Sequence, residues 1–119
     1  MKFKVLLIGL GRMGMGYDLN LDSSQFIYSH ARAVQMHPDF QFLGAVDISE
    51  YNRLVFENNY NLLSYQNIGL ALKQVRPDVI IVSTPTDTHL GVIEEIFKFR
   101  CPDIILCEKP LANESKTAA

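Results

Sequence analysis

The feature that most constrains the fold is a glycine-rich turn close to the N-terminus. The sequence GLGRMG at residues 9–14 matches the pattern G-x-G-x-x-G, and it directly follows the apolar run Phe3–Ile8. A short apolar run that ends in glycine is typical of a buried strand. In a strand–turn–helix unit the first glycine allows a tight turn, the second lets a ligand approach the backbone, and the third lets the helix pack closely on the strand. A turn with a purely structural role would not need all three glycines.

Strand-like segments recur along the rest of the chain. After the first strand at Phe3–Ile8, we expect strands at Phe40–Val46, 62–65, 78–83 and 103–107. The last two are continuous and rich in β-branched residues, as parallel strands buried on both faces should be. The segment at 62–65 is the weakest of the five.

Apolar residues spaced three or four apart predict helices between these strands. One helix is expected to run from a cap at Ser23 or Ser24 to about Met36, and a second contains residues 68–75 and stops before Pro77. A third helix is expected to have an apolar stripe formed by Ile93, Ile96 and Phe97. The charged side chains of this helix are expected to face away from that stripe; they are Glu94, Glu95 and Lys98.

Alternating strands and helices predict right-handed crossovers and a parallel sheet with helices on both faces. We therefore expect an α/β fold, a doubly wound parallel sheet of the Rossmann type with about five strands in the order 3-2-1-4-5. The length of 119 residues fits one dinucleotide-binding domain over residues 1–119. Residues 16–29 are polar and lack a helical period, so we expect a loop inserted into the first crossover, either a flap over a site or a passive insertion.

Composition and charge exclude several classes of protein. Hydrophobic residues make up 48% of the chain and charged residues 20%, which is typical of a folded globular domain. The net charge of −2 and the lack of any run of Lys or Arg argue against a nucleic-acid partner. The longest apolar runs are far shorter than the ~20 residues of a membrane span. We expect no membrane partner and no metal site.

The first residues and the two cysteines indicate a reducing compartment. A short basic start precedes an apolar run, as in a signal peptide, but the run stops at Gly9 and no small-residue cleavage site follows. Cys101 and Cys107 would lie ~20 Å apart along a strand, whereas a disulfide requires Cα atoms within ~7 Å. We therefore expect two reduced thiols in a cytoplasmic protein.

An acidic residue at the end of the second strand is the other part of a dinucleotide site. Such a residue binds the ribose hydroxyls of adenosine and usually lies ~20 residues after the glycines. Asp47 follows the strand Phe40–Val46, but it lies 38 residues after Gly9. The insertion at 16–29 accounts for most of this excess. The alternative is that Asp47 is the N-cap of a helix that begins near Ser49.

Ligands in such folds bind beyond the carboxyl ends of the strands, so the residues after the fourth and fifth strands are candidates for function. STPTDTH at 83–89 follows the fourth strand, and EKP at 108–110 follows the fifth. A lysine at this place must be solvated or paired, and Glu108 is its neighbour. The alternatives are that Lys109 is a surface cation and that His89 is buried in the first turn of a helix.

Taken together, these segments resemble the Gfo/Idh/MocA oxidoreductases, the family of glucose–fructose oxidoreductase and inositol dehydrogenase. The resemblance rests on GLGRMG, on GAVD at the end of the second strand, on VSTPTDTH and on EKP, and it covers nearly the whole chain. The combination of T-P-x-x-x-H with E-K-P is far more specific than the glycine turn.

The resemblance implies a nicotinamide dinucleotide as cofactor and a role for each matching residue. The pyrophosphate would be surrounded by Gly9, Leu10, Gly11, Arg12, Met13 and Gly14, and Asp47 would contact the adenosine ribose. The nicotinamide side would be lined by Ser83, Thr84, Pro85, His89, Glu108, Lys109 and Pro110. Lys109 would be the catalytic residue, as a proton donor or acceptor or by polarising the reacting carbon–oxygen bond. NAD is expected rather than NADP, because Asp47 would repel the 2′-phosphate.

Family members are much longer, and their second α/β domain supplies the substrate pocket. The resemblance therefore implies that residues 1–119 are the N-terminal cofactor domain of a dehydrogenase. A small carbohydrate-type substrate would be held by the missing domain, so this chain alone is expected to be inactive. A homo-oligomer is compatible with this organisation.

Two other functions remain open at this point. One is a free-standing dinucleotide-binding or sensor module that acts through a partner protein. The other is a methyltransferase-like domain, whose glycine turn can be similar. The tripeptide EKP argues against the second, because such a domain has no evident need of a lysine after the fifth strand.

Overall fold

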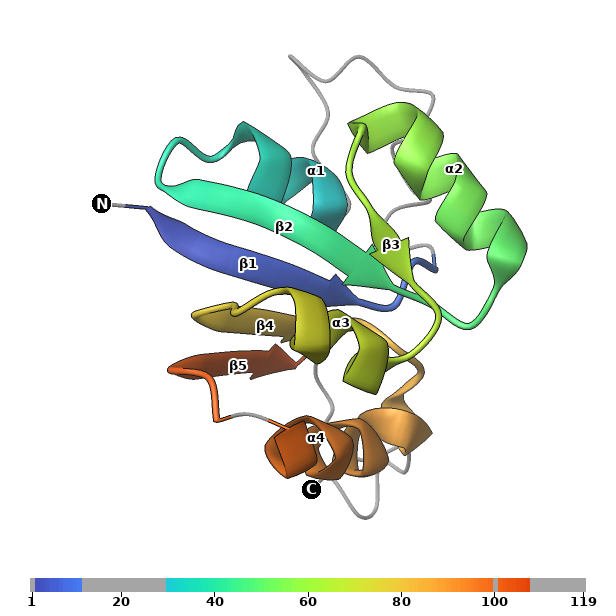
Figure 1. Cartoon of the computed structure of the whole chain (residues 1–119), viewed down its shortest axis with the longest axis vertical. Coiled ribbons are helices and arrows are strands. Elements are labelled where there is room, and N and C mark those ends of the chain that lie inside the picture. The colour runs from blue at the N-terminus through green and yellow to red at the C-terminus, as the bar shows by residue number, and fades with distance from the viewer. Residues whose placement is uncertain (1, 12–29, 100, 108–119) are drawn as a thin grey trace.

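The computed structural model describes residues 2–11, 30–99 and 101–107 of the chain. Strands and helices alternate along its described residues, and a 3₁₀ turn at Thr86–Thr88 precedes α4 (His89–Phe99) (Figure 1). The elements in chain order are β1 (Phe3–Ile8), α1 (His30–Met36), β2 (Phe40–Val46), α2 (Glu50–Tyr60), β3 (Ser64–Tyr65), α3 (Ile68–Gln74), β4 (Val79–Val82), α4 (His89–Phe99) and β5 (Ile104–Cys107). The expected strands are confirmed, although β3 has only two residues.

The five strands form one parallel sheet in the order β3-β2-β1-β4-β5. The predicted strand order and direction are therefore confirmed. β1 lies at the centre and pairs with β2 on one side and with β4 on the other. The carboxyl ends of these three strands consequently lie next to one another, directly after Ile8, Val46 and Val82.

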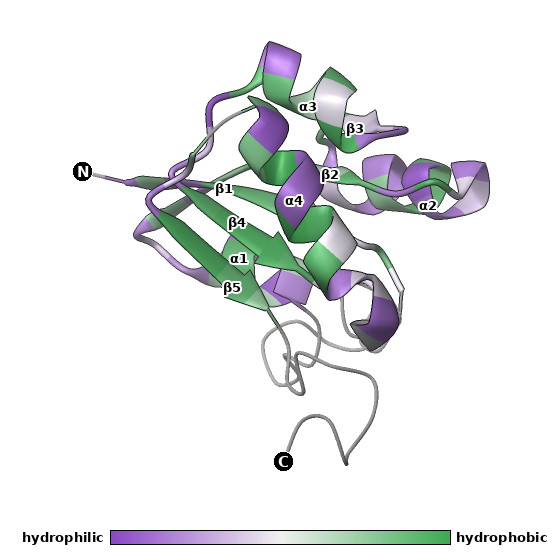
Figure 2. Ribbon diagram, turned by 90° about the horizontal axis from the view of Figure 1, so that it is seen from below, coloured by the Kyte–Doolittle hydropathy of each residue, from purple (hydrophilic) through white to green (hydrophobic). Residues whose placement is uncertain are grey.

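Alternate residues of the central strand face opposite sides of the sheet. Val5 and Leu7 pack into a core with residues of α1 and α2, whereas Leu6 and Ile8 pack into a second core with residues of α3 and α4. Seen from below, α3 and α4 lie on one side of the sheet and α1 lies on the other (Figure 2). Helices cover both faces, as expected for a parallel sheet.

One extra residue interrupts the pairing of β2 with β1. Phe42 pairs with Val5, but Gly44 pairs with Leu6, so Leu43 is an unpaired bulge residue. Gly44 has φ of +151°, and a Cβ atom there would lie 2.5 Å from the carbonyl oxygen of Leu63. Glycine is therefore required beside the bulge, which shifts the side-chain alternation of β2 by one position.

The face that α4 turns toward the sheet differs from the expected one. Ile96 is fully buried as expected, but Phe97 is 54% exposed. The residues that pack inward are His89, Val92 and Ile96, spaced three and four apart. The expected stripe of Ile93, Ile96 and Phe97 is therefore wrong at Phe97, because the helix turns Val92 toward the sheet in its place. Glu95 is partly exposed to solvent as expected, at 41%, but it also lies at the wall of a pocket.

Both cysteines lie within the described part of the chain. Cys101 and Cys107 are free thiols, as expected, and burial raises the pKa of the Cys107 thiol. No helix in the described part of the chain has the length and apolar character needed to cross a membrane. The expected cap at Ser23 or Ser24 and the insertion at 16–29 lie outside the described residues.

Candidate functional site

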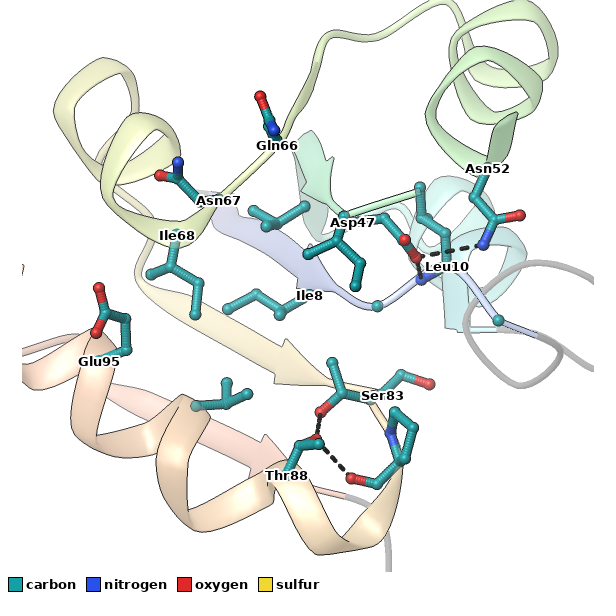
Figure 3. A pocket seen from close by; sticks show the side chains of 17 residues that line it. Ile8, Leu10, Asp47, Asn52, Gln66, Asn67, Ile68, Ser83, Thr88 and Glu95 are labelled. Carbon is teal, nitrogen blue, oxygen red and sulfur yellow. Dashed lines mark hydrogen bonds between the residues drawn. The ribbon is translucent and has the colours of Figure 1, made fainter. Parts of the chain in front are cut away.

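A pocket of about 600 Å³ opens where β1, β2 and β4 end (Figure 3). This volume lies within the range of ~300–1,000 Å³ that is typical of small-molecule sites. Most of its wall is apolar and is formed by Ile8, Leu10, Val46, Ile48, Ile68, Pro85 and Val92. Its polar side chains are Asp47, Asn52, Gln66, Asn67, Ser83, Thr84, Thr88 and Glu95.

Gly9 joins the two sides of this pocket. Its backbone N–H donates to the carbonyl of Val46 at 2.8 Å. Its φ is +102°, and a Cβ atom would lie 2.7 Å from the carbonyl carbon and oxygen of Ser83. Both the backbone angle and the space therefore require glycine at this position. The first glycine of the turn allows β1 and β4 to end in direct contact.

Gly11 is glycine for a different reason. A Cβ atom at this position would meet no atom of the described residues within 4 Å, and its φ lies outside the left-handed region. The backbone is therefore exposed to the pocket, with room for a ligand to approach it. Arg12, Met13 and Gly14, the other predicted residues of this turn, lie outside the described residues.

Asp47 is held against the glycine turn. Its Oδ2 accepts a hydrogen bond from the backbone N–H of Leu10 at 2.7 Å, and its Oδ1 accepts one from the N–H of Ser49 at 2.8 Å. Asn52 lies 3.5 Å away through Nδ2, and Arg53 donates to the backbone carbonyl of Asp47 at 2.8 Å. The carboxylate is thus fixed at the pocket wall, where its remaining lone pairs can accept further hydrogen bonds.

The start of α2 decides between the two interpretations of Asp47. The N-cap of this helix is Ser49, whose hydroxyl accepts from the N–H of Asn52 at 3.2 Å. Asp47 supports the cap through the N–H of Ser49 but is not itself the capping residue. The interpretation of Asp47 as the N-cap is therefore wrong, and the carboxylate lines the pocket.

The turn after β4 contains a pair of hydrogen-bonded hydroxyls. The Thr88 hydroxyl lies 2.7 Å from the Thr84 hydroxyl and 2.6 Å from the carbonyl oxygen of Pro85 (Figure 3). A carbonyl oxygen only accepts and a hydroxyl has one hydrogen, so Thr88 donates to Pro85 and accepts from Thr84. Thr84 can therefore offer its remaining lone pairs to the pocket as an acceptor.

His89 supports this turn from behind. Its side chain is 1% exposed, and its Nε2 lies 2.9 Å from the carbonyl oxygen of Thr84. Nε2 must donate in this bond, since the carbonyl can only accept. Among the described residues, His89 Nδ1 and Ser83 Oγ are buried without a hydrogen-bond partner. Buried polar atoms of this kind are uncommon, and near a pocket they point to a partner that the described residues do not supply.

The structure brings together part of the predicted site. Gly9, Leu10, Gly11, Asp47, Ser83, Thr84 and Pro85 all line the pocket. His89 does not line it and acts on it through Thr84, which agrees with the alternative that placed it in the first turn of a helix. Glu108, Lys109 and Pro110 lie outside the described residues.

Other residues of the pocket were not predicted. Ile48 follows the end of β2 directly and is 88% exposed, which is unusual for an isoleucine. Gln66 and Asn67 follow β3, and Val92 and Glu95 lie on α4. The rule that ligands bind beyond the strand ends would have found Ile48, Gln66 and Asn67. No group of three or more potential metal ligands occurs among the described side chains.

Comparison with known proteins places this geometry in a family. Residues 3–119 match the family model GFO_IDH_MocA, described as an oxidoreductase family with an NAD-binding Rossmann fold. The chain belongs to this family. The predicted family resemblance and the expectation of an NAD-binding fold are therefore confirmed.

Individual relatives agree with this assignment. The chain is 27% identical over 121 residues to the rhizopine catabolism protein MocA of Rhizobium meliloti, a match that covers 99% of this chain and 33% of that protein. The chain thus spans about a third of the length of this curated relative.

Two solved structures share the fold. The WlbA dehydrogenase of Bordetella pertussis, crystallised with NADH and UDP-GlcNAcA, superposes with a TM-score of 0.73 at 20% identity, over 96% of this chain and 31% of that one. A myo-inositol dehydrogenase of Corynebacterium glutamicum gives a TM-score of 0.68 at 22% identity, over 94% of this chain and 29% of that one.

Proposed function

We propose that this chain is the cofactor-binding part of an oxidoreductase that transfers hydride between NAD and a sugar, nucleotide sugar or polyol. The observation that carries the proposal is the exposed backbone of Gly11 in a pocket at the ends of β1, β2 and β4. Family membership supports the same cofactor. The substrate class rests on relatives that include a MocA protein and a myo-inositol dehydrogenase.

The described residues fit the parts of a dinucleotide. Backbone near Gly11 is open to a pyrophosphate, and the buried hydroxyl of Ser83 has no hydrogen-bond partner within the described ranges. The fixed carboxylate of Asp47 can accept hydrogen bonds from the two ribose hydroxyls of adenosine. The exposed side chain of Ile48 offers an apolar surface for the adenine ring.

The catalytic role belongs to Lys109 in this proposal. When bound, the nicotinamide supplies the hydride chemistry, and the protein supplies orientation and electrostatics. Lys109 follows β5 in the sequence, and a cation there would stabilise negative charge on the substrate oxygen in the transition state. Substrate contacts would come from the remainder of a longer protein, since relatives extend well beyond this chain.

Replacing Gly11 tests the site directly. Gly11→Leu should abolish NADH binding while the free energy of unfolding changes little, because the new side chain begins at the pocket wall, where a Cβ atom meets no atom of the described residues. NADH fluorescence titration and urea denaturation measure the two effects. Gly91→Leu is the matched control, because Gly91 on α4 is also surrounded by open space and lies outside the pocket. Normal NADH affinity in Gly11→Leu would contradict the proposal.

The preference between the two cofactors is a second test. Asp47 should repel the 2′-phosphate of NADP, so NADH should bind at least about tenfold more tightly than NADPH at low salt. Arg53 is the nearest cation in the sequence, but its guanidinium is engaged by the backbone carbonyl of Asp47. Equal affinities, or an NADPH preference that Arg53→Ala removes, would contradict the assignment.

A further inference from the structure

A second carboxylate lines the pocket at the end away from the glycine turn. Glu95 lies on α4, two turns after the helix begins at His89, and its side chain is 41% exposed. In Figure 3 it lies on the side of Asn67 and Ile68, whereas Leu10 and Asn52 lie at the opposite end. The pocket is therefore bounded by a carboxylate at each end of its apolar wall.

The ion pair of Glu95 does not account for its place in the pocket. Its Oε1 lies 3.4 Å from the Nζ of Lys98, and both side chains are well exposed. Exposed pairs of this kind contribute little, because solvent screens them and both side chains lose freedom. No hydrogen bond or ion pair among the described residues engages the other oxygen, Oε2. A carboxylate only accepts hydrogen bonds, so Glu95 is free to accept one from a ligand donor in the pocket.

The order of the pocket residues indicates which part of a ligand would meet Glu95. In the proposed function, on which this inference rests, Asp47 contacts the adenosine ribose and Ile48 contacts the base. Beyond these two, the pocket continues between Ile68 on α3 and Val92 on α4. These side chains form apolar walls suited to a flat ring. The far edge of the base would then lie toward Glu95.

We propose that Glu95 accepts a hydrogen bond from the exocyclic amine of adenine and so selects this base. Adenine carries an amino group as a donor at this edge, whereas hypoxanthine and guanine carry a carbonyl oxygen there. A carboxylate accepts from the amine but is repelled by the carbonyl, since both groups are acceptors. Asp47 and Glu95 are the only charged side chains among the described lining residues, and Lys98, the cation paired with Glu95, does not line the pocket.

The experiment compares NADH with its hypoxanthine analogue, nicotinamide hypoxanthine dinucleotide in reduced form. Fluorescence titration of the full 119-residue chain should give an affinity about five- to tenfold higher for NADH, as expected for one partly exposed charge-assisted hydrogen bond. Glu95→Gln should reduce this ratio to about one, because the amide can donate to the carbonyl of hypoxanthine. Glu94→Gln removes the same charge from an exposed neighbour on α4 that does not line the pocket, and it should keep the ratio.

The outcomes separate this inference from the proposed function. Equal binding of the two dinucleotides by the unchanged chain, or an unchanged ratio in Glu95→Gln, would overturn the role of Glu95 while leaving the dinucleotide site intact. Failure of the unchanged chain to bind either dinucleotide would overturn the proposed function, and the role of Glu95 with it.

Discussion

On one side of the pocket, the β2 wall (Leu10 and Asp47) has a carboxylate whose two oxygens each accept a backbone N–H. On the other side, the β4 wall (Ser83 and Thr84, with His89 behind them) contains two buried polar atoms without a partner among the described residues. The carboxylate of the β2 wall is thus held in place by hydrogen bonds within the chain, whereas the β4 wall contains buried groups that lack a partner among the described residues.

The β2 wall is held in position before a ligand binds, and the β4 wall contains groups that a ligand could satisfy. Groups that are already hydrogen-bonded hold their positions before a ligand arrives, so binding orders fewer of them. A buried group without a partner costs free energy, about 1–3 kcal/mol, until a ligand, water or another part of the protein satisfies it. The β2 wall is therefore expected to matter for both stability and binding, and the β4 wall mainly for binding.

The largest effect is expected where the two walls meet. Gly9→Ala should lower the free energy of unfolding by about 3 kcal/mol or more, because φ of +102° strains any side chain and the new Cβ would lie 2.7 Å from Ser83. Urea denaturation measures this loss. Gly11→Ala is the control and should cost less than about 1 kcal/mol, since its Cβ meets no atom within 4 Å in the described part of the chain. Equal losses of stability in Gly9→Ala and Gly11→Ala would mean that the close approach of Gly9 to Ser83 does not hold the two walls together.

A smaller effect is expected within the β2 wall. Asp47→Ala should lower the free energy of unfolding by about 1–2 kcal/mol, because the N–H groups of Leu10 and Ser49 lose their acceptor and water replaces it only in part. Chemical denaturation again provides the measurement. Asp87→Ala removes the same charge from an exposed position in the 3₁₀ turn and should change stability by less than about 0.5 kcal/mol. A variant at Asp47 as stable as the control would show that this wall is not preorganised.

The smallest effect is expected within the β4 wall. Ser83→Ala should leave the free energy of unfolding unchanged within about 0.5 kcal/mol or raise it, because the lost hydroxyl has no partner among the described residues. The increase in Tm caused by saturating NADH should nevertheless be smaller in the variant. A clear loss of stability without ligand would mean that this hydroxyl is already satisfied, and the contrast between the walls would disappear.

The fold could be predicted from the sequence because its signals are local. Apolar runs such as Phe3–Ile8 and 78–83 stop at turn residues, and the helical spacing between them leaves one parallel arrangement. Gly9 and Asp47 were also predictable, since each follows directly on a strand.

The rest of the pocket depends on packing that the sequence shows only weakly. Because β3 has only two residues, its end is hard to recognise in the sequence, and Gln66 and Asn67 were not predicted as pocket residues. The helical pattern places Glu95 with Glu94 and Lys98 on the face opposite the expected apolar stripe. The position of Glu95 at the pocket wall depends on the rotation of α4 about its own axis, which also turns Phe97 outward.

The bulge at Leu43 determines which way the end of β2 faces. Before it, Phe42 packs with the core of α1 and α2; after it, Ala45 does so, three residues later instead of two or four. If the same residues continued in a regular pleat with no bulge, Val46 would face that core, and Asp47 would leave the strand on the opposite side from the N–H of Leu10. Every strand of the sheet could still form, but the carboxylate would be separated from the glycine turn. The pairing register of β2, as much as its chemistry, therefore encodes the site.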